Sequence, residues 1–121
     1  MLDMGEGGTA VFVHQTSPWA EILAAGGELD LAVVPQFSSA LEKLFDGSLP
    51  VVLDLSECSY LDSTILRVLV GACNAWPGRF GIVIPTGARV RRVFQVAGLE
   101  GALLIGASRE DLQQHFLTKS S

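Results

Sequence analysis

Two short, almost unbroken apolar runs restrict the folds open to this chain more than any other feature of its sequence. They occupy residues 49–55 and 80–84, and Asp54 is the only charged residue in either run. Neighbouring side chains of a strand point to opposite faces of a sheet, so a continuous apolar run is typical of a strand covered on both faces. The two runs therefore predict an α/β protein with buried central strands.

Segments with helical spacing of apolar residues separate and follow these runs. We expect helices over residues 33–45, 62–75, 88–96 and 108–116, because apolar side chains recur there every three or four positions. Asp30 stands before the first of these segments, where a carboxylate accepts a hydrogen bond from a helix N-terminal N–H group. The sequence thus alternates strand-forming and helix-forming segments.

The remaining apolar stretches complete a sheet. Residues 10–14 and 19–24 are predicted to pair as a hairpin, residues 103–105 to form a short strand, and residues 56–60 to be a connector. The predicted order is β-β-α-β-α-β-α-β-α. Strands that alternate with helices run parallel within one sheet. We therefore expect a mixed sheet of about four or five strands, with about four helices packed along one face.

Length and composition indicate one domain in the cytoplasm. The chain has 121 residues, enough for a single core. We assign residues 10–121 to the domain and the glycine-containing residues 1–9 to a flexible N-terminal tail. The first residues lack the positive charge and apolar stretch of a signal peptide, and no apolar run reaches the ~20 residues of a membrane span. We expect no membrane insertion.

Charge and side-chain chemistry exclude several functions. Eight Lys and Arg against thirteen Asp and Glu give a net charge of −5, which repels nucleic acid. The two histidines, His14 and His115, lie near opposite ends of the chain, and neither Cys58 nor Cys73 has metal-ligand spacing to another ligand. No serine occupies a nucleophile elbow. We therefore expect no enzyme activity, no metal ion and no cofactor.

The start of the helix at Asp62 is the most informative polar site. A helix N-terminus presents unpaired N–H groups and a partial positive charge, so a phosphoryl group is tolerated on a hydroxyl of the first turn. Ser63 and Thr64 provide such hydroxyls. Asp62 and Ser63 are also good capping residues, and from their spacing alone a purely structural role is the favoured interpretation.

The helix that follows is apolar on almost every side. Beyond its first turn only Arg67 and Asn74 are polar. A helix that covers one face of a sheet needs an apolar stripe of only about 100°. The excess apolar surface therefore either lies deeper in the core or meets a partner near the start of the helix, and the sequence leaves both interpretations open.

Four motifs in order resemble one family, the STAS domains of anti-sigma factor antagonists. They are residues 27–30 (GELD), 53–56 (LDLS), 61–66 (LDSTIL) and 90–99 (VRRVFQVAGL), and the resemblance extends over about residues 10–117. It implies the STAS fold. It also implies that Ser63 corresponds to the serine that a partner anti-sigma factor, itself a serine kinase, phosphorylates.

The resemblance further implies a partner-switching function. The unphosphorylated antagonist binds the anti-sigma factor and frees the sigma factor, phosphorylation releases the antagonist, and a PP2C-type phosphatase resets it. In the family fold three carboxylates, those of Glu28, Asp30 and Asp62, lie close to the phosphorylated serine. We expect the partner to dock around the strand-to-helix junction at Asp62. The eight residues expected to take part are Glu28, Asp30, Asp62, Ser63, Thr64, Ile65, Arg67 and Val68.

The chain departs from the family pattern at Ile65, where the family usually has glycine. Some STAS domains work without phosphorylation, as scaffolds in signalling assemblies or as small subunits of lipid-transport complexes. A changed phosphorylation site fits such a protein, which is the alternative to the antagonist function. The sequence leaves open whether the chain forms a homodimer.

Overall fold

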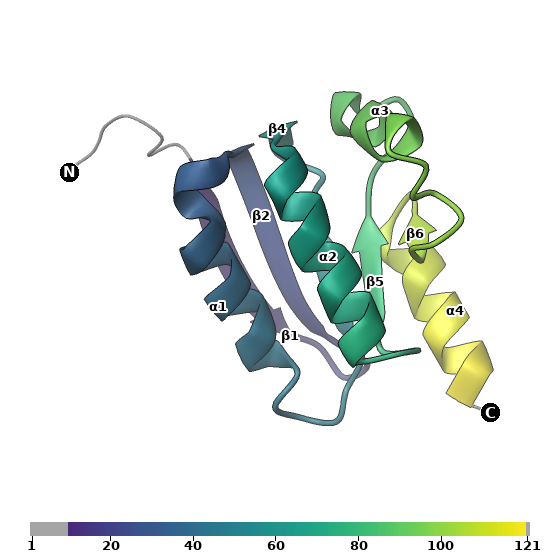
Figure 1. Ribbon diagram of the computed structural model, residues 1–121. Coiled ribbons are helices and arrows are strands. Elements are labelled where there is room, and N and C mark those ends of the chain that lie inside the picture. Colours follow the sequence, from purple (N-terminus) through teal and green to yellow (C-terminus); the bar gives the residue numbers. More distant parts are fainter. Residues whose placement is uncertain (1–9, 121) are drawn as a thin grey trace.

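The structure, a computed structural model, describes residues 10–120 and forms a helix-flanked sheet (Figure 1). The predicted tail, residues 1–9, lies outside the described residues. The elements are β1 (Val11–Thr16), β2 (Glu21–Leu29), the 3-10 turn η1 (Leu31–Val33), α1 (Val34–Leu44), β3 (Val51–Asp54), β4 (Cys58–Leu61), α2 (Ser63–Ala75), β5 (Phe80–Val83), α3 (Arg89–Val96), β6 (Ile105–Gly106) and α4 (Arg109–Ser120).

The sheet has the predicted mixed topology. β1 and β2 form the antiparallel hairpin, and β2, β3, β5 and β6 then run parallel in that order. The sheet has six strands, one more than expected, because β4 pairs with the end of β2. The prediction that residues 56–60 are only a connector is therefore wrong. The predicted α/β class and the mixed sheet are confirmed.

β2 is longer than its apolar residues suggested. It continues through Gly26 and Gly27 to Leu29, and its register with β4 shifts between Gly27 and Glu28. Gly27 has a φ of 81°, a conformation that costs glycine little and other residues much. The irregularity has the character of a β-bulge, which bends a strand without ending it. The glycine pair that follows the predicted strand thus carries β2 from one partner strand to the next.

One face of the sheet holds the main core. α1 and α2 cover this face, and the largest fully buried side chains include Phe37 of α1, Leu69 of α2 and Leu53 of β3. α3 lies across the end of the sheet near the start of α2 (Figure 1), and it adds Val90 and Phe94 to the same core. The main core therefore fixes the relative positions of α2 and α3.

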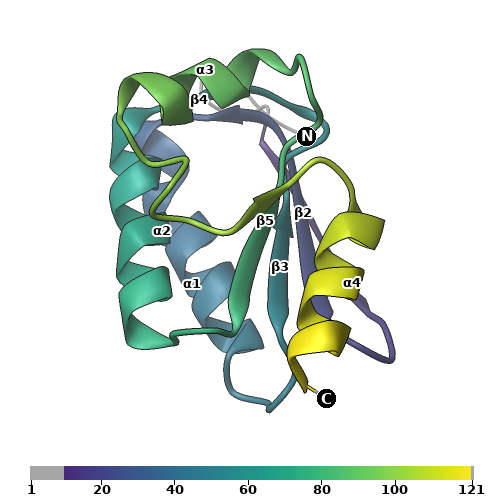
Figure 2. The same ribbon diagram turned by 90° about the vertical axis from the view of Figure 1, so that its right-hand side faces the viewer.

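The opposite face is covered by α4, so the prediction that all helices pack along one face is wrong (Figure 2). Leu112 and Phe116 of α4 form a second core with Val52 of β3 and Val83 of β5. Val51 and Leu53, the neighbours of Val52, belong to the main core. Because successive residues of these strands are apolar on both faces, both faces need a cover.

Glycines in β5 and β6 let α4 approach the sheet closely. A Cβ added at Gly81 would lie 3.1 Å from the Leu112 side chain and 3.2 Å from Phe116, and one added at Gly106 would lie 3.2 Å from Leu112. All three distances are shorter than ordinary van der Waals contact. The second core is therefore built on the absence of side chains at these two positions.

We expect Gly81→Val to lower the free energy of unfolding by about 1–3 kcal/mol, because the added carbons overpack the second core. Urea denaturation followed by circular dichroism measures this loss. The matched control is Gly71→Val on the exposed side of α2, where nothing lies within 4 Å of an added Cβ. Equal stabilities of the two variants would contradict the close approach of α4.

Candidate functional site

The ends of β2 and β4 lie side by side and bring two helix starts together. Leu29 pairs with Leu61, and the Asp62 N–H donates to the Leu29 carbonyl oxygen at 2.9 Å. Asp30 follows the first strand and Asp62 the second, so the turn before α1 and the start of α2 are neighbours at one end of the sheet (Figure 1). The short strand β4 is thus what positions the junction.

Asp62 caps α2, as the sequence predicts. Its extended backbone (φ −77°, ψ 150°) precedes the helix, and its Oδ1 accepts hydrogen bonds from the Thr64 N–H at 2.8 Å and the Thr64 hydroxyl at 2.7 Å. The Thr64 N–H and then the Thr64 hydroxyl lower the pKa of the Asp62 carboxyl. Asp62 is therefore ionised at neutral pH and holds the first turn of α2 in place.

The two neighbouring hydroxyls of this turn are in different states. The Thr64 hydroxyl donates to Asp62 and its residue is half-buried. Ser63 is exposed, and its hydroxyl has no hydrogen-bond partner among residues 10–120. The Ser63 hydroxyl is therefore accessible from solvent, whereas the Thr64 hydroxyl is already hydrogen-bonded to Asp62.

Three carboxylates belong to the paired ends of β2 and β4 or follow them directly. Asp30 accepts from the Ala32 N–H at 3.1 Å and caps the turn that leads into α1. Glu28 is exposed on β2 and pairs in register with Tyr60 of β4. Two of the three carboxylates, those of Asp30 and Asp62, are thus used for capping. Together with Glu28 they make this side of the junction acidic.

The remaining predicted docking residues divide between surface and core. Arg67 is exposed on the second turn of α2. Ile65 is 0% exposed in the main core, so the prediction that its side chain contacts a partner is wrong. Val68 is half-buried and lines a hollow between α1 and α2 rather than the junction. Most of the excess apolar surface of α2 is accordingly explained by core packing.

Sequence reasoning missed apolar side chains that surround the junction. Leu31 is 63% exposed after the Asp30 cap, Tyr60 is 49% exposed on β4, and Val96 is 76% exposed on α3. Large exposed hydrophobic side chains near one another are typical of a protein-binding surface. β4 gives little signal in the sequence, because it has only four residues, of which the first and last are buried and the middle two exposed.

A groove separates the start of α2 from α3. Its volume is about 430 Å³, and the residues that line it are Ser63, Leu66, Arg89, Arg92, Val93, Val96 and Ala97. Arg89 and Arg92 are the charged residues of this lining, and both belong to α3. Their place beside Ser63 depends on how α3 crosses the end of the sheet, which no local pattern encodes.

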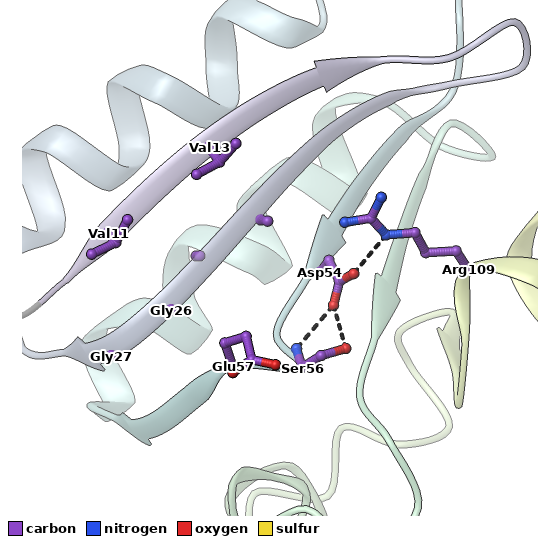
Figure 3. A pocket seen from close by; sticks show the side chains of 10 residues that line it. Val11, Val13, Gly26, Gly27, Asp54, Ser56, Glu57 and Arg109 are labelled. Atoms are coloured by element: carbon purple, nitrogen blue, oxygen red, sulfur yellow. Dashed lines mark hydrogen bonds and ion pairs between the residues drawn. The ribbon is translucent and has the colours of Figure 1, made fainter.

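A second hollow of about 490 Å³ lies on the other face of the sheet, and Figure 3 shows its polar centre. Asp54 Oδ2 accepts from Arg109 Nε of α4 at 2.7 Å, and Asp54 Oδ1 accepts from the Ser56 N–H and hydroxyl. Burial raises the pKa of Asp54, but the Ser56 and Arg109 hydrogen bonds outweigh it, and the pKa is lowered overall. The ion pair between Asp54 and Arg109 thus joins the end of β3 to the start of α4.

Residues 13–106 match the family model described as "Mlab, STAS domain". The anti-sigma-B factor antagonist of Staphylococcus aureus is 30% identical over 88 residues, which cover 70% of this chain and 82% of that protein. No helix within residues 10–120 has the length and apolar character needed to cross a membrane.

Solved structures share the fold. An anti-sigma factor antagonist from Mycobacterium paratuberculosis is 23% identical with a TM-score of 0.77, covering 91% of this chain and 92% of that one. The antagonist SpoIIAA in its unphosphorylated form is 23% identical with a TM-score of 0.67, covering 86% and 95%. At these identities the likeness concerns the fold alone.

Proposed function

This chain belongs to the STAS domain family, and from that membership we propose that it is an anti-sigma factor antagonist that acts by partner switching in the cytoplasm. In its unphosphorylated form it binds an anti-sigma factor that is also a serine kinase. Phosphorylation of Ser63 releases it, and a PP2C-type phosphatase restores the binding form. The names of the curated relatives support the first part of this proposal.

The state of the Ser63 hydroxyl is the observation that carries the phosphorylation step. It is exposed in the first turn of α2, while the neighbouring Thr64 hydroxyl is held by Asp62 at 2.7 Å. In kinase reactions the acceptor oxygen attacks the γ-phosphoryl group and the kinase takes the hydroxyl proton. The chain supplies the acceptor and a docking surface, and the proposal assigns it no catalytic group.

Phosphorylation changes the charge of the docking surface. A phosphoserine carries about −1.5 to −2 charges at neutral pH. It would stand at the end of the molecule that also carries the carboxylates of Glu28, Asp30 and Asp62 and the exposed side chains of Leu31 and Tyr60. Each 1.4 kcal/mol of repulsion or desolvation at an interface weakens binding about tenfold. A modest penalty is therefore enough for a switch.

The test is an incubation with ATP and the anti-sigma factor kinase encoded nearest to this protein, followed by mass measurement of the intact chain. We expect one phosphoryl group on the native chain and none on Ser63→Ala. The matched control is Ser39→Ala, which removes the hydroxyl of another exposed serine, on α1. We expect this variant to receive one phosphoryl group, as the native chain does. A phosphoryl group that persists on Ser63→Ala would rule out the assignment.

Ile65 supports a second candidate, a STAS scaffold or small transport-complex subunit that binds without phosphorylation. It stands where the family usually has glycine, and its side chain fills the core beneath the junction. Affinity purification of the native chain from its own cells separates the two functions. Recovery of a transporter ATPase instead of a kinase would favour the second candidate.

A further inference from the structure

The groove between α2 and α3 places one hydroxyl opposite two arginines. Ser63 lies on the α2 side of the groove, and Arg89 and Arg92 lie on the α3 side. The other lining residues are apolar or small, with Leu66 buried and Val93 half-buried. The polar side-chain groups that line the groove are therefore one hydroxyl and two guanidinium groups.

Arg89 and Arg92 differ from most of the other arginines that the structure describes. Arg91 Nη1 donates to the Ile84 carbonyl at 2.7 Å, and Arg91 lies 3.4 Å from Glu100. Arg79 donates to three backbone carbonyls, and Arg109 binds Asp54. Within residues 10–120, the side chains of Arg89 and Arg92 have no hydrogen bond or ion pair. Their donors are free to bind an anion.

The packing of α3 keeps both arginines at the groove. Val90 and Phe94 are buried in the main core and fix the opposite side of the helix. Arg89 and Arg92 are three positions apart, so they lie one turn apart on one side of α3. This spacing lets two planar donor groups approach one anion from the same direction.

We propose that Arg89 and Arg92 form an intramolecular binding site for the phosphate of phosphorylated Ser63. This inference rests on the proposed phosphorylation of Ser63. The phosphate would turn from the solvent into the groove, where both guanidinium groups donate to its oxygens. The phosphoserine ester is the only covalent bond between the phosphate and the chain, and the contacts with the two arginines are hydrogen bonds.

Charge decides the direction in which the phosphate turns. On one side of Ser63 lie the carboxylates of Glu28, Asp30 and Asp62, which repel it. On the other side lie the two free arginines, and guanidinium groups bind phosphate through paired, charge-assisted hydrogen bonds. The partial positive charge at the N-terminus of α2 adds to this attraction. The energetically favoured position is therefore over the groove.

Binding of the phosphate to α3 has a consequence for partner release. In the unphosphorylated chain the two arginines are exposed in a molecule of net charge −5. They form a local basic spot that suits acidic side chains of a partner. Once the phosphate neutralises them, that spot is lost, so the chain is released by masking of its basic contacts as well as by added negative charge.

The experiment measures the second pKa of the phosphate by ³¹P NMR, on protein with phosphoserine incorporated at position 63 during translation. The pKa of an ordinary phosphoserine is about 6. Nearby positive groups favour the dianion, so we expect a value lower by about one unit. Arg89→Gln/Arg92→Gln is expected to return it to about 6 or above, and each single substitution to give part of that change.

Lys43→Gln is the matched control, since it removes one positive charge from an exposed position on α1, away from the groove. It should leave the phosphate pKa unchanged. Arg67, one turn beyond Ser63 on α2, is kept in every variant. Circular dichroism should show that the arginine variants, both altered at exposed positions, fold as the native chain does.

Equal phosphate pKa values in the native chain and the double variant would overturn the inference, and so would a native value above that of ordinary phosphoserine. Because translation installs the phosphoserine, this result is independent of any kinase. Failure of the kinase to modify Ser63 would instead count against the proposed function. The two failures are therefore distinguishable.

Discussion

Phe94→Ala is expected to lower the free energy of unfolding by about 3–5 kcal/mol, the range for removing a buried aromatic ring from a core. Phe94 is among the largest fully buried side chains, and it attaches the eight-residue α3 to the main core. Such a short helix has little stability of its own and depends on this anchor. Urea denaturation with circular dichroism and tryptophan fluorescence measures the loss.

The control for Phe94→Ala is Val96→Ala on the same helix. Val96 is exposed, so its truncation should change stability by no more than about 0.5 kcal/mol. If the two variants were equally stable, α3 would not be anchored as described. The arginines on α3 would then have no fixed place opposite Ser63.

Asp54→Asn is expected to lower the free energy of unfolding by about 2–3 kcal/mol at pH 7, because it removes the charge that pairs with Arg109. Asp54 is buried and accepts hydrogen bonds from Ser56 as well as from Arg109 at 2.7 Å. The Arg109 side chain is 37% exposed, so water partly compensates the arginine. Urea denaturation at pH 7 provides the measurement.

The pH dependence of this effect follows from the lowered pKa of Asp54. A carboxyl whose pKa is lower in the folded than in the unfolded chain stabilises the fold fully above its unfolded pKa, near 3.8. That stabilisation is lost as the pH falls through the folded pKa. The difference between the native chain and Asp54→Asn should therefore stay constant from pH 7 to about pH 5 and shrink below pH 4.

Asp46→Asn, an exposed aspartate after α1, controls for general effects of removing a negative charge. It should be close to native stability throughout. A difference for Asp54→Asn that remained constant down to pH 3 would show that its carboxylate is not what binds Arg109.

Much of the fold is predictable from the sequence, because the strands and helices that pack the core carry their own signals. The apolar runs that became β3 and β5 alternate between the two cores, and the helix starting at Asp62 begins where its cap predicts. What local patterns do not encode is pairing between distant segments. β4 has four residues and exists because the end of β2 lies beside it. The side of the sheet on which α4 packs is equally a tertiary outcome.

The candidate site likewise has a part that the sequence predicts and a part that it does not. Asp62, Ser63 and the neighbouring acidic residues follow from capping chemistry and from motif order, and the structure brings them together at one end. Ile65 was misplaced because a helix that is apolar on most sides does not reveal which side faces the core. The place of Arg89 and Arg92 in the groove beside Ser63 was not predicted, because it depends on the crossing of α3 over the sheet.

The position of α4 has a practical consequence for measuring binding. α4 runs along the face of the sheet opposite to α1 and α2, and its C-terminus lies at the other end of the molecule from the start of α2 (Figure 2). Leu117, in the last turns of α4, is exposed. A cysteine introduced there can carry a fluorophore or tether the protein to a sensor chip. The end of the molecule that bears Ser63 then projects into solution, accessible to a captured partner.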